Sequence, residues 1–309
     1  MRFFACLTIC SVVLLLAGLG APSVAQDRGK IGSARLFNND AFGDGDDRWR
    51  TSSYQWGQVR ARSDWTGARP LAFGDIVEYR YRSEIIAPRD IGALDPADRR
   101  YSGVRGLGAH THFARRGYEI STGVDLLFTG EQTGAGDLQK WFHKLIGQPQ
   151  PIDAVLDNQI PNAIHPTLTF DIARSVPVGQ TALVRPFGEV MYGIEDLARV
   201  GVDFVMGADV RQQLLVRDAV TGTLILGTPT QTAGFSLIMG ADTAFVNDSA
   251  FFTDGTGPEV KDQRSRARVG VDWQGKRMGA YFGLTYLSEE FEGQSEGQVL
   301  GSVNLSVSF

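Results

Sequence analysis

The chain has 309 residues, a formal net charge of -5 and a mean hydropathy of -0.11, which is close to neutral. No basic segment with interleaved aromatic residues stands out, so nucleic acid is not an expected partner. After residue 25, no apolar run reaches the length of a membrane-spanning helix, which excludes a helical membrane protein. This composition fits a soluble domain or a β-barrel, because barrel strands dilute their apolar face with polar lumen residues.

Residues 1–25 predict a secretory signal peptide. They combine a short basic start, an apolar run and an end with small residues at Ser23 and Ala25. Cleavage after Ala25 would remove Cys6 and Cys10, the two cysteines of the chain. The mature chain, residues 26–309, is therefore expected to form one barrel domain without disulfides or thiolate metal sites.

Strand-like alternation of apolar and polar residues runs through the mature chain. The last segment alternates from Val299 to Phe309, and the chain ends inside a strand on an aromatic residue, as the chains of bacterial outer-membrane barrels do. The same period of two recurs at 77–82, 119–128 and 266–286. The pattern favours an all-β, antiparallel outer-membrane β-barrel over a soluble sandwich, whose strands also alternate.

Counting strands from both ends, with periplasmic termini and an even number, gives about 12 strands. The first is expected over residues 32–42, the second from Thr51 and the fourth from Tyr101. Residues 209–233 fit this count least well. Their short apolar runs predict either an additional hairpin or long strand extensions.

The segment at 129–160 interrupts the strands with a helical pattern and predicts a short helix in an extracellular loop. Leu138 and Phe142 fall on one side of this helix, while Gln139 and His143 share a neighbouring face. An imidazole can act as a general base near neutral pH, and an amide one turn away can orient it or a bound substrate. The alternative is that His143 is a surface or capping residue of an amphipathic helix.

In this topology, polar residues from several segments meet at the outer rim. They are Asn39, Asp40, Thr51, Arg99, Tyr101, Gln139 and His143. The acidic turn at Asp44, Asp46 and Asp47 lacks the later glutamate of a calcium-binding hand, so a solvated turn is expected there.

The order and spacing of these motifs resemble those of the LpxR-type lipid A 3-O-deacylases of bacterial outer membranes. The resemblance spans essentially the whole mature chain. It is carried by Asn39-Asp40 with Phe42, Asp47-Arg48 before Thr51, Asp98-Arg99 with Tyr101 and Gly103, Gln139 with His143, Asp157-Asn158-Gln159, and Glu290-Phe291 before the closing strand.

The resemblance implies an outer-membrane barrel that uses calcium and water to hydrolyse the ester bond of the 3-linked acyl group of lipid A. Its partner would be lipopolysaccharide in the outer leaflet, and we expect a monomer. The catalytic group it implies comprises His143 as general base with Asn39, Asp40, Thr51 and Gln139. It also implies Asp40 and Asn39 as calcium ligands, with Arg99 and Tyr101 as substrate contacts.

The chemistry is consistent with these residues, because ester hydrolysis needs a base and a positive centre for the oxyanion. His143 would supply the base, and a calcium ion bound by Asp40 would supply the charge. Asp40 alternatively only caps the turn before Gly43. Two other functions remain open: a non-catalytic barrel acting as a narrow channel or structural protein, and an outer-membrane phospholipase. A phospholipase would be expected to pair a serine with His143, and a channel needs more lumen than about 12 strands leave.

Overall fold

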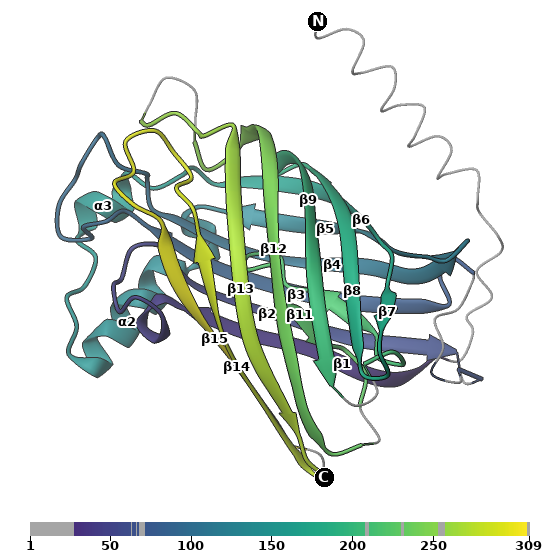
Figure 1. Cartoon of the computed structure of the whole chain (residues 1–309). Helices are drawn as coiled ribbons and strands as arrows, with labels where there is room; N and C mark the ends of the chain where they lie inside the picture. The colour runs from purple at the N-terminus through teal and green to yellow at the C-terminus, as the bar shows by residue number, and fades with distance from the viewer. Residues whose placement is uncertain are drawn as a thin grey trace, which may run out of the picture.

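The computed structural model describes residues 28–307 except residues 63, 66, 68–71, 208–209, 230–231 and 253–256. Within them, one antiparallel sheet closes on itself as a barrel (Figure 1). The expected signal peptide at 1–25 and the terminal Phe309 lie outside the described residues. Across the described ranges, none of the helices is both long and apolar enough to span a membrane.

Twelve strands form the barrel wall, so the expected strand number is confirmed. They are β1 (Arg28–Asn39), β2 (Trp49–Arg62), β3 (Ile76–Ala87), β4 (Ser102–Arg115), β5 (Tyr118–Thr129), β6 (Ala163–Ala173), β8 (Ala182–Tyr192), β9 (Glu195–Gly207), β12 (Gly234–Ser249), β13 (Gln263–Gln274), β14 (Met278–Leu287) and β15 (Gln298–Val307). Each pairs with its neighbours along the chain, and β1 pairs with β15 to close the barrel. The short β7 (Val176–Val178) pairs with β8 next to the end of β6.

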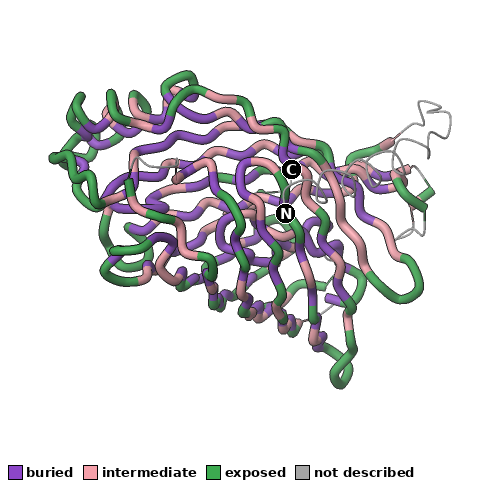
Figure 2. The backbone as a smooth tube through the Cα atoms, turned by 90° about the horizontal axis from the view of Figure 1, so that it is seen from above, coloured by how far each residue is buried: buried purple, intermediate pink, exposed green. Residues whose placement is uncertain are grey.

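The wall is charged inside and apolar outside. Along β3, Glu78, Arg80, Arg82 and Glu84 are at most 7% exposed, whereas Tyr79 between them is 51% exposed. Figure 2 shows the same alternation of buried and exposed residues along the strands. The inward charges are paired, with Arg80 2.9 Å from Glu78 and Arg82 2.6 Å from Glu84. This is the arrangement that a lipid-facing exterior around a polar lumen requires.

Residues 210–229 fold back into the lumen. Of the two alternatives predicted for this region, an additional hairpin or long strand extensions, the structure shows the hairpin. The hairpin comprises β10 (Leu215–Arg217) and β11 (Leu224–Leu226). Leu215 and Leu224 pack in one buried cluster with residues of the wall such as Ala34 and Val59. The tip of the hairpin is tied to the wall through polar contacts, because Arg217 forms ion pairs at 3.1 Å with Asp171 and at 2.9 Å with Asp203. The hairpin therefore fills part of the lumen with a small apolar core that it shares with the wall.

The outer end of β1 differs from the expected strand at 32–42. The strand ends at Asn39, whose side-chain oxygen accepts a hydrogen bond from the backbone N–H of Ala41 and caps the 3-10 turn η1 (Asp40–Phe42). The loop after β5 contains η2 (Glu131–Thr133), α2 (Ala135–Ile146) and α3 (Asp153–Asp157) at the same end of the barrel (Figure 1). The expected helix in this loop is confirmed.

Candidate active site on the outer wall of the barrel

Helix α2 lies beside the outer ends of β1 and β2 with its polar side turned toward the barrel. Gln139 and His143 are 4% and 7% exposed, while Trp141 and Leu145 are 61% and 67% exposed. In a water-soluble protein an amphipathic helix buries its apolar side. Helix α2 instead buries its polar side and exposes its apolar side, as the strands of the barrel wall do. This orientation brings Gln139 and His143 into a protected space.

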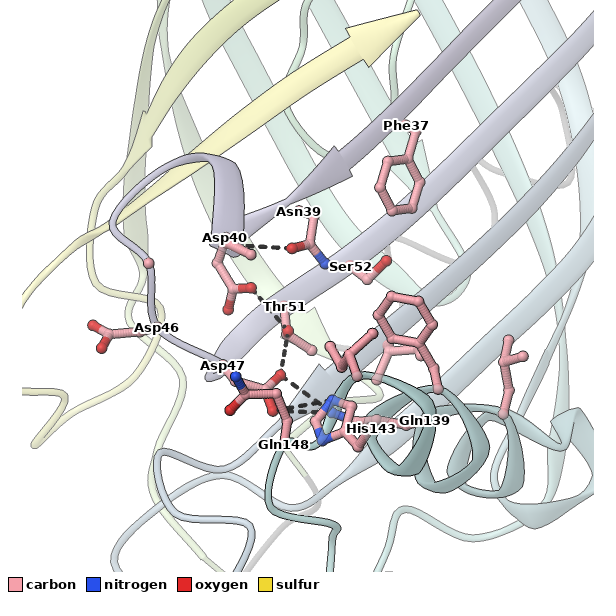
Figure 3. A pocket seen from close by; sticks show the side chains of 16 residues that line it. Phe37, Asn39, Asp40, Asp46, Asp47, Thr51, Ser52, Gln139, His143 and Gln148 are labelled. Atoms are coloured by element: carbon pink, nitrogen blue, oxygen red, sulfur yellow. Dashed lines mark hydrogen bonds and ion pairs between the residues drawn. The ribbon is translucent and has the colours of Figure 1, made fainter.

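A cavity of about 380 Å³ separates α2 from the wall (Figure 3). Its apolar lining includes Phe37, Ile85, Leu138, Phe142 and Ile146, and its polar lining includes Asn39, Asp40, Asp47, Thr51, Ser52, Gln139, His143 and Gln148. Phe37, Ser52 and Ile85 occupy positions of β1, β2 and β3 that alternate with buried lumen residues. The cavity therefore lies on the membrane-facing side of the wall, at its outer end.

Asp47 connects the polar side chains of this cavity. Its carboxylate accepts a hydrogen bond of 2.7 Å from the Thr51 hydroxyl and one of 3.2 Å from Nε2 of Gln139. Nε2 of His143 lies 3.4 Å from Oδ2 of the same carboxylate. One acidic side chain thus joins the start of β2 to both polar residues of α2, as Figure 3 shows.

The His143 ring is held by its other nitrogen. Nδ1 lies within hydrogen-bond distance of the backbone oxygen of Pro149 and donates to it. In the neutral ring, such a bond places the proton on Nδ1 and leaves the lone pair on Nε2. Because Nε2 faces the cavity beside Asp47, the ring can accept a proton from a molecule bound there.

Asp40 lies on the other side of Thr51 and is only 1% exposed. It accepts a hydrogen bond of 2.9 Å from the Arg48 N–H, and its Oδ1 lies 3.1 Å from the oxygen of the Thr51 hydroxyl. Burial raises the pKa of the Asp40 carboxyl to about 8, with the negative charge of Asp47 adding to the effect and the hydrogen bonds opposing it. A buried carboxyl beside a second one is a place where a cation would relieve an electrostatic cost.

The oxygen atoms around Asp40 suit a hard cation such as calcium. Asp40 and Asp47 supply carboxylates and Thr51 a hydroxyl, while the buried Oε1 of Gln139 has no hydrogen-bond partner among the described residues. Oδ1 of Asn39 caps η1 and keeps a second lone pair. In the part of the chain that the structure describes, no three or more histidine, cysteine or acidic side chains group as metal ligands. Neutral oxygens would therefore have to complete a calcium site here.

The structure does not bring Arg99 and Tyr101 to this cavity. The Arg99 guanidinium is buried at the outer end of the lumen, where it forms an ion pair with Glu290 and lies 5.1 Å from the centre of the Phe252 ring. Tyr101 is 1% exposed and packs in a cluster with Ala135 of α2. Neither residue lines the cavity, so the structure does not place them as contacts of a substrate bound there.

The expectation of a solvated acidic turn is correct only for part of that turn. Asp46 forms an ion pair of 2.6 Å with Arg48 and is half exposed, whereas Asp47 reaches into the cavity. Asp47 is absent from the catalytic residues that were predicted from the sequence. The signal that could have found it is its position four residues before Thr51, which allows their side chains to meet across the start of β2.

Known proteins resemble this chain in both sequence and structure. The profile of the family described as outer membrane protein LpxR matches residues 7–309. The chain belongs to the LpxR family. The resemblance seen in the motifs is thereby confirmed, and the protein is an outer-membrane β-barrel.

Among solved structures, LpxR from Salmonella typhimurium matches with a TM-score of 0.70 and 16% identity, covering 90% of this chain and all of that one. At this identity the match shows a shared fold. The β domain of the Bordetella autotransporter BrkA matches with a TM-score of 0.44 and 11% identity, covering 90% of this chain and 100% of that chain. No curated protein sequence matches the chain.

Proposed function

We propose that this LpxR-family barrel is a lipid A 3-O-deacylase that hydrolyses the ester of the 3-linked acyl group with the help of calcium. Membership of the family supports the coarser assignment, an outer-membrane barrel that modifies lipid A. The observation that supports the finer one is the position of His143: its Nδ1 is held by the Pro149 carbonyl, and its Nε2 lies beside the Asp47 carboxylate in a cavity on the membrane side of the wall, which Asp40 also lines.

His143 acts as the general base. Nε2 takes a proton from a water molecule as the water oxygen bonds to the ester carbonyl carbon. The same nitrogen then returns the proton to the sugar oxygen as the ester C–O bond breaks, so a carboxylic acid and an alcohol leave. The Pro149 carbonyl keeps the ring in the required tautomer, and Asp47 stabilises the imidazolium that forms in between.

Calcium would be held by Asp40, with Asn39, Thr51 and Asp47 as neighbouring oxygen donors. When bound, it would supply positive charge for the oxyanion of the tetrahedral intermediate. Gln139 keeps Asp47 in place from the side of α2.

The surface around the cavity fits an acyl ester of the outer leaflet. Phe37, Ile85 and Phe142 give the cavity an apolar side, and the exposed residues of α2 continue the apolar exterior of the barrel. An acyl chain can therefore enter sideways from the membrane, while its ester reaches the polar side at His143.

The test is hydrolysis of lipopolysaccharide by the purified barrel, followed by mass spectrometry of lipid A and of the released fatty acid. Wild type is expected to release the 3-linked chain. His143→Ala should lower the rate by roughly a hundredfold or more, the scale of a lost general base. His165→Ala is the matched control, since His165 contacts Thr129 and does not line the cavity. Release of no acyl chain by well-folded wild type would refute the proposed function.

A further inference from the structure

The first residues of β2 have an irregular backbone beside the candidate site. Trp49 is 2% exposed and has a φ of 52°, a left-handed conformation that a bulky residue rarely adopts. The register with β3 shifts there, because Trp49 faces Ala87 while Ser52 faces Ile85. Two residues of β2 lie between these pairs and one residue of β3 does, so β2 contains a bulge.

The bulge changes the side of the wall that the following residues face. Arg50 points into the lumen, where it forms ion pairs at 3.0 Å with Glu84 and 2.6 Å with Glu290. Thr51 and Ser52 both line the outer cavity. Strict alternation from Ser52 would place Thr51 inside and Arg50 outside. The extra residue therefore puts the Thr51 hydroxyl beside Asp40 and Asp47.

Gln298, the first residue of β15, holds this bulge from the other side. Its Oε1 accepts a hydrogen bond of 3.1 Å from the Arg50 N–H, and its Nε2 donates one of 2.6 Å to the Arg48 carbonyl. These two backbone groups flank Trp49. β1 does not reach them, since its ladder with β2 ends at the pair of Asn39 and Ser52. The amide of Gln298 thus occupies the place of a missing strand neighbour.

We propose that Gln298 is a positioning residue for the reaction: its amide bridges Arg48 and Arg50, fixes the bulge at Trp49, and so aims Thr51 and Asp47 into the cavity. This inference rests on the proposed function. Gln298 touches no reacting atom and acts through the backbone of β2. The N–H of Arg48 also donates to Asp40, so the same peptide segment links the amide to both carboxylates.

The test compares Gln298→Met, which keeps the length and removes both hydrogen bonds, with Gln294→Met as the matched control. Gln294 also bridges two backbone groups, the Glu290 N–H and the Glu296 carbonyl, but within its own loop. Gln298→Met is expected to lower kcat by between roughly tenfold and a hundredfold with little change in KM, the scale of a small misplacement of reacting groups. Gln294→Met should keep the wild-type rate. An unchanged rate in Gln298→Met, or an equal loss in both variants, would overturn the proposal.

A conservative variant gives a second kinetic readout. Gln298→Glu keeps the acceptor for Arg50 and, when ionised, lacks the donor for the Arg48 carbonyl. Because position 298 is only 2% exposed, burial would raise the pKa of this carboxyl, and its protonated form can donate again. The ratio of the rate of this variant to that of wild type should therefore rise as the pH falls. A ratio that does not change with pH would contradict the role of the donor.

The last readout does not need activity. With Cys6 and Cys10 replaced by serine, Thr51→Cys is the single thiol of the chain and can be labelled with a small thiol reagent. Adding Gln298→Met should slow the labelling, because the thiol at position 51 would turn away from the cavity. Slower labelling supports the bridge even if wild type releases no acyl chain, a result that would refute only the proposed function. Unchanged labelling would overturn the bridge.

Discussion

At the scale of single residues, the candidate site depends on Asp47, which joins Thr51, Gln139 and His143. Asp47→Asn keeps the shape but removes the charge beside the imidazole. We expect the rate of acyl release to fall at least tenfold, in the range of roughly 10- to 100-fold seen when an orienting partner is lost. The control is Asp44→Asn, which makes the same change in the same loop where the carboxylate accepts from Val299. Equal activity of both variants would show that Asp47 has no special role.

The raised pKa of Asp40 makes a second prediction. Burial raises the pKa of this carboxyl to about 8, so without a cation it stays protonated at neutral pH. Below this pKa, calcium would have to displace a proton from Asp40. Above it, the carboxylate is already ionised. The calcium concentration for half-maximal activity should therefore rise about tenfold for each pH unit below the pKa and level off above it. Titration of activity with calcium at several pH values tests this, and full activity in strong chelator would remove calcium from the mechanism.

Part of the site could be predicted from the sequence because its residues lie at the ends of regular elements. Asn39 and Asp40 end β1, Thr51 lies near the start of β2, and Gln139 and His143 share one face of α2. All five line one cavity. Asp47 was harder to choose from three similar aspartates in one loop. Its position four residues before Thr51 is a local signal, but Gln139 and His143 lie about 90 residues away, and only the folded loop brings them to it.

At the scale of elements, α2 was predictable as a helix from its period, but its orientation was not. The surroundings of a helix decide which side it buries, and here these include the membrane. Leu145→Glu should raise the KM for lipopolysaccharide in vesicles by roughly thirtyfold, because moving an ionised side chain into the apolar region costs on the order of 2 kcal/mol. A short-chain water-soluble ester should be hydrolysed as by wild type.

The control for this helix is Lys144→Glu, which places the same carboxylate one residue away at a position that is already charged and exposed. It should leave the KM for lipopolysaccharide near the wild-type value. If Leu145→Glu binds vesicle substrate as tightly as wild type, the exposed side of α2 does not contact the membrane.

At the scale of the whole molecule, the number and order of the wall strands followed from alternation and from the turns between strands. The lumen hairpin at 215–226 could not be placed, because short apolar runs fit a strand extension equally well. Deleting 215–226 joins Leu214 to Gly227, which already share a backbone hydrogen bond of 2.8 Å. The shortened barrel should conduct ions in a planar bilayer well above the wild-type level. Equal conductance would mean that the side chains of the wall close the lumen by themselves.

The seam between β1 and β15 also affects when the site forms during biogenesis. The register of this seam comprises three pairs, from Phe37 with Val303 to Asn39 with Gly301. Asp44 and Val299 exchange hydrogen bonds beside it, across about 255 residues of sequence. A chain crossing the periplasm, with its first and last strands still apart, cannot assemble the loop that carries Asp40 and Asp47. The candidate hydrolytic centre thus exists only in a finished barrel, when the protein has reached the membrane whose lipids it would cut.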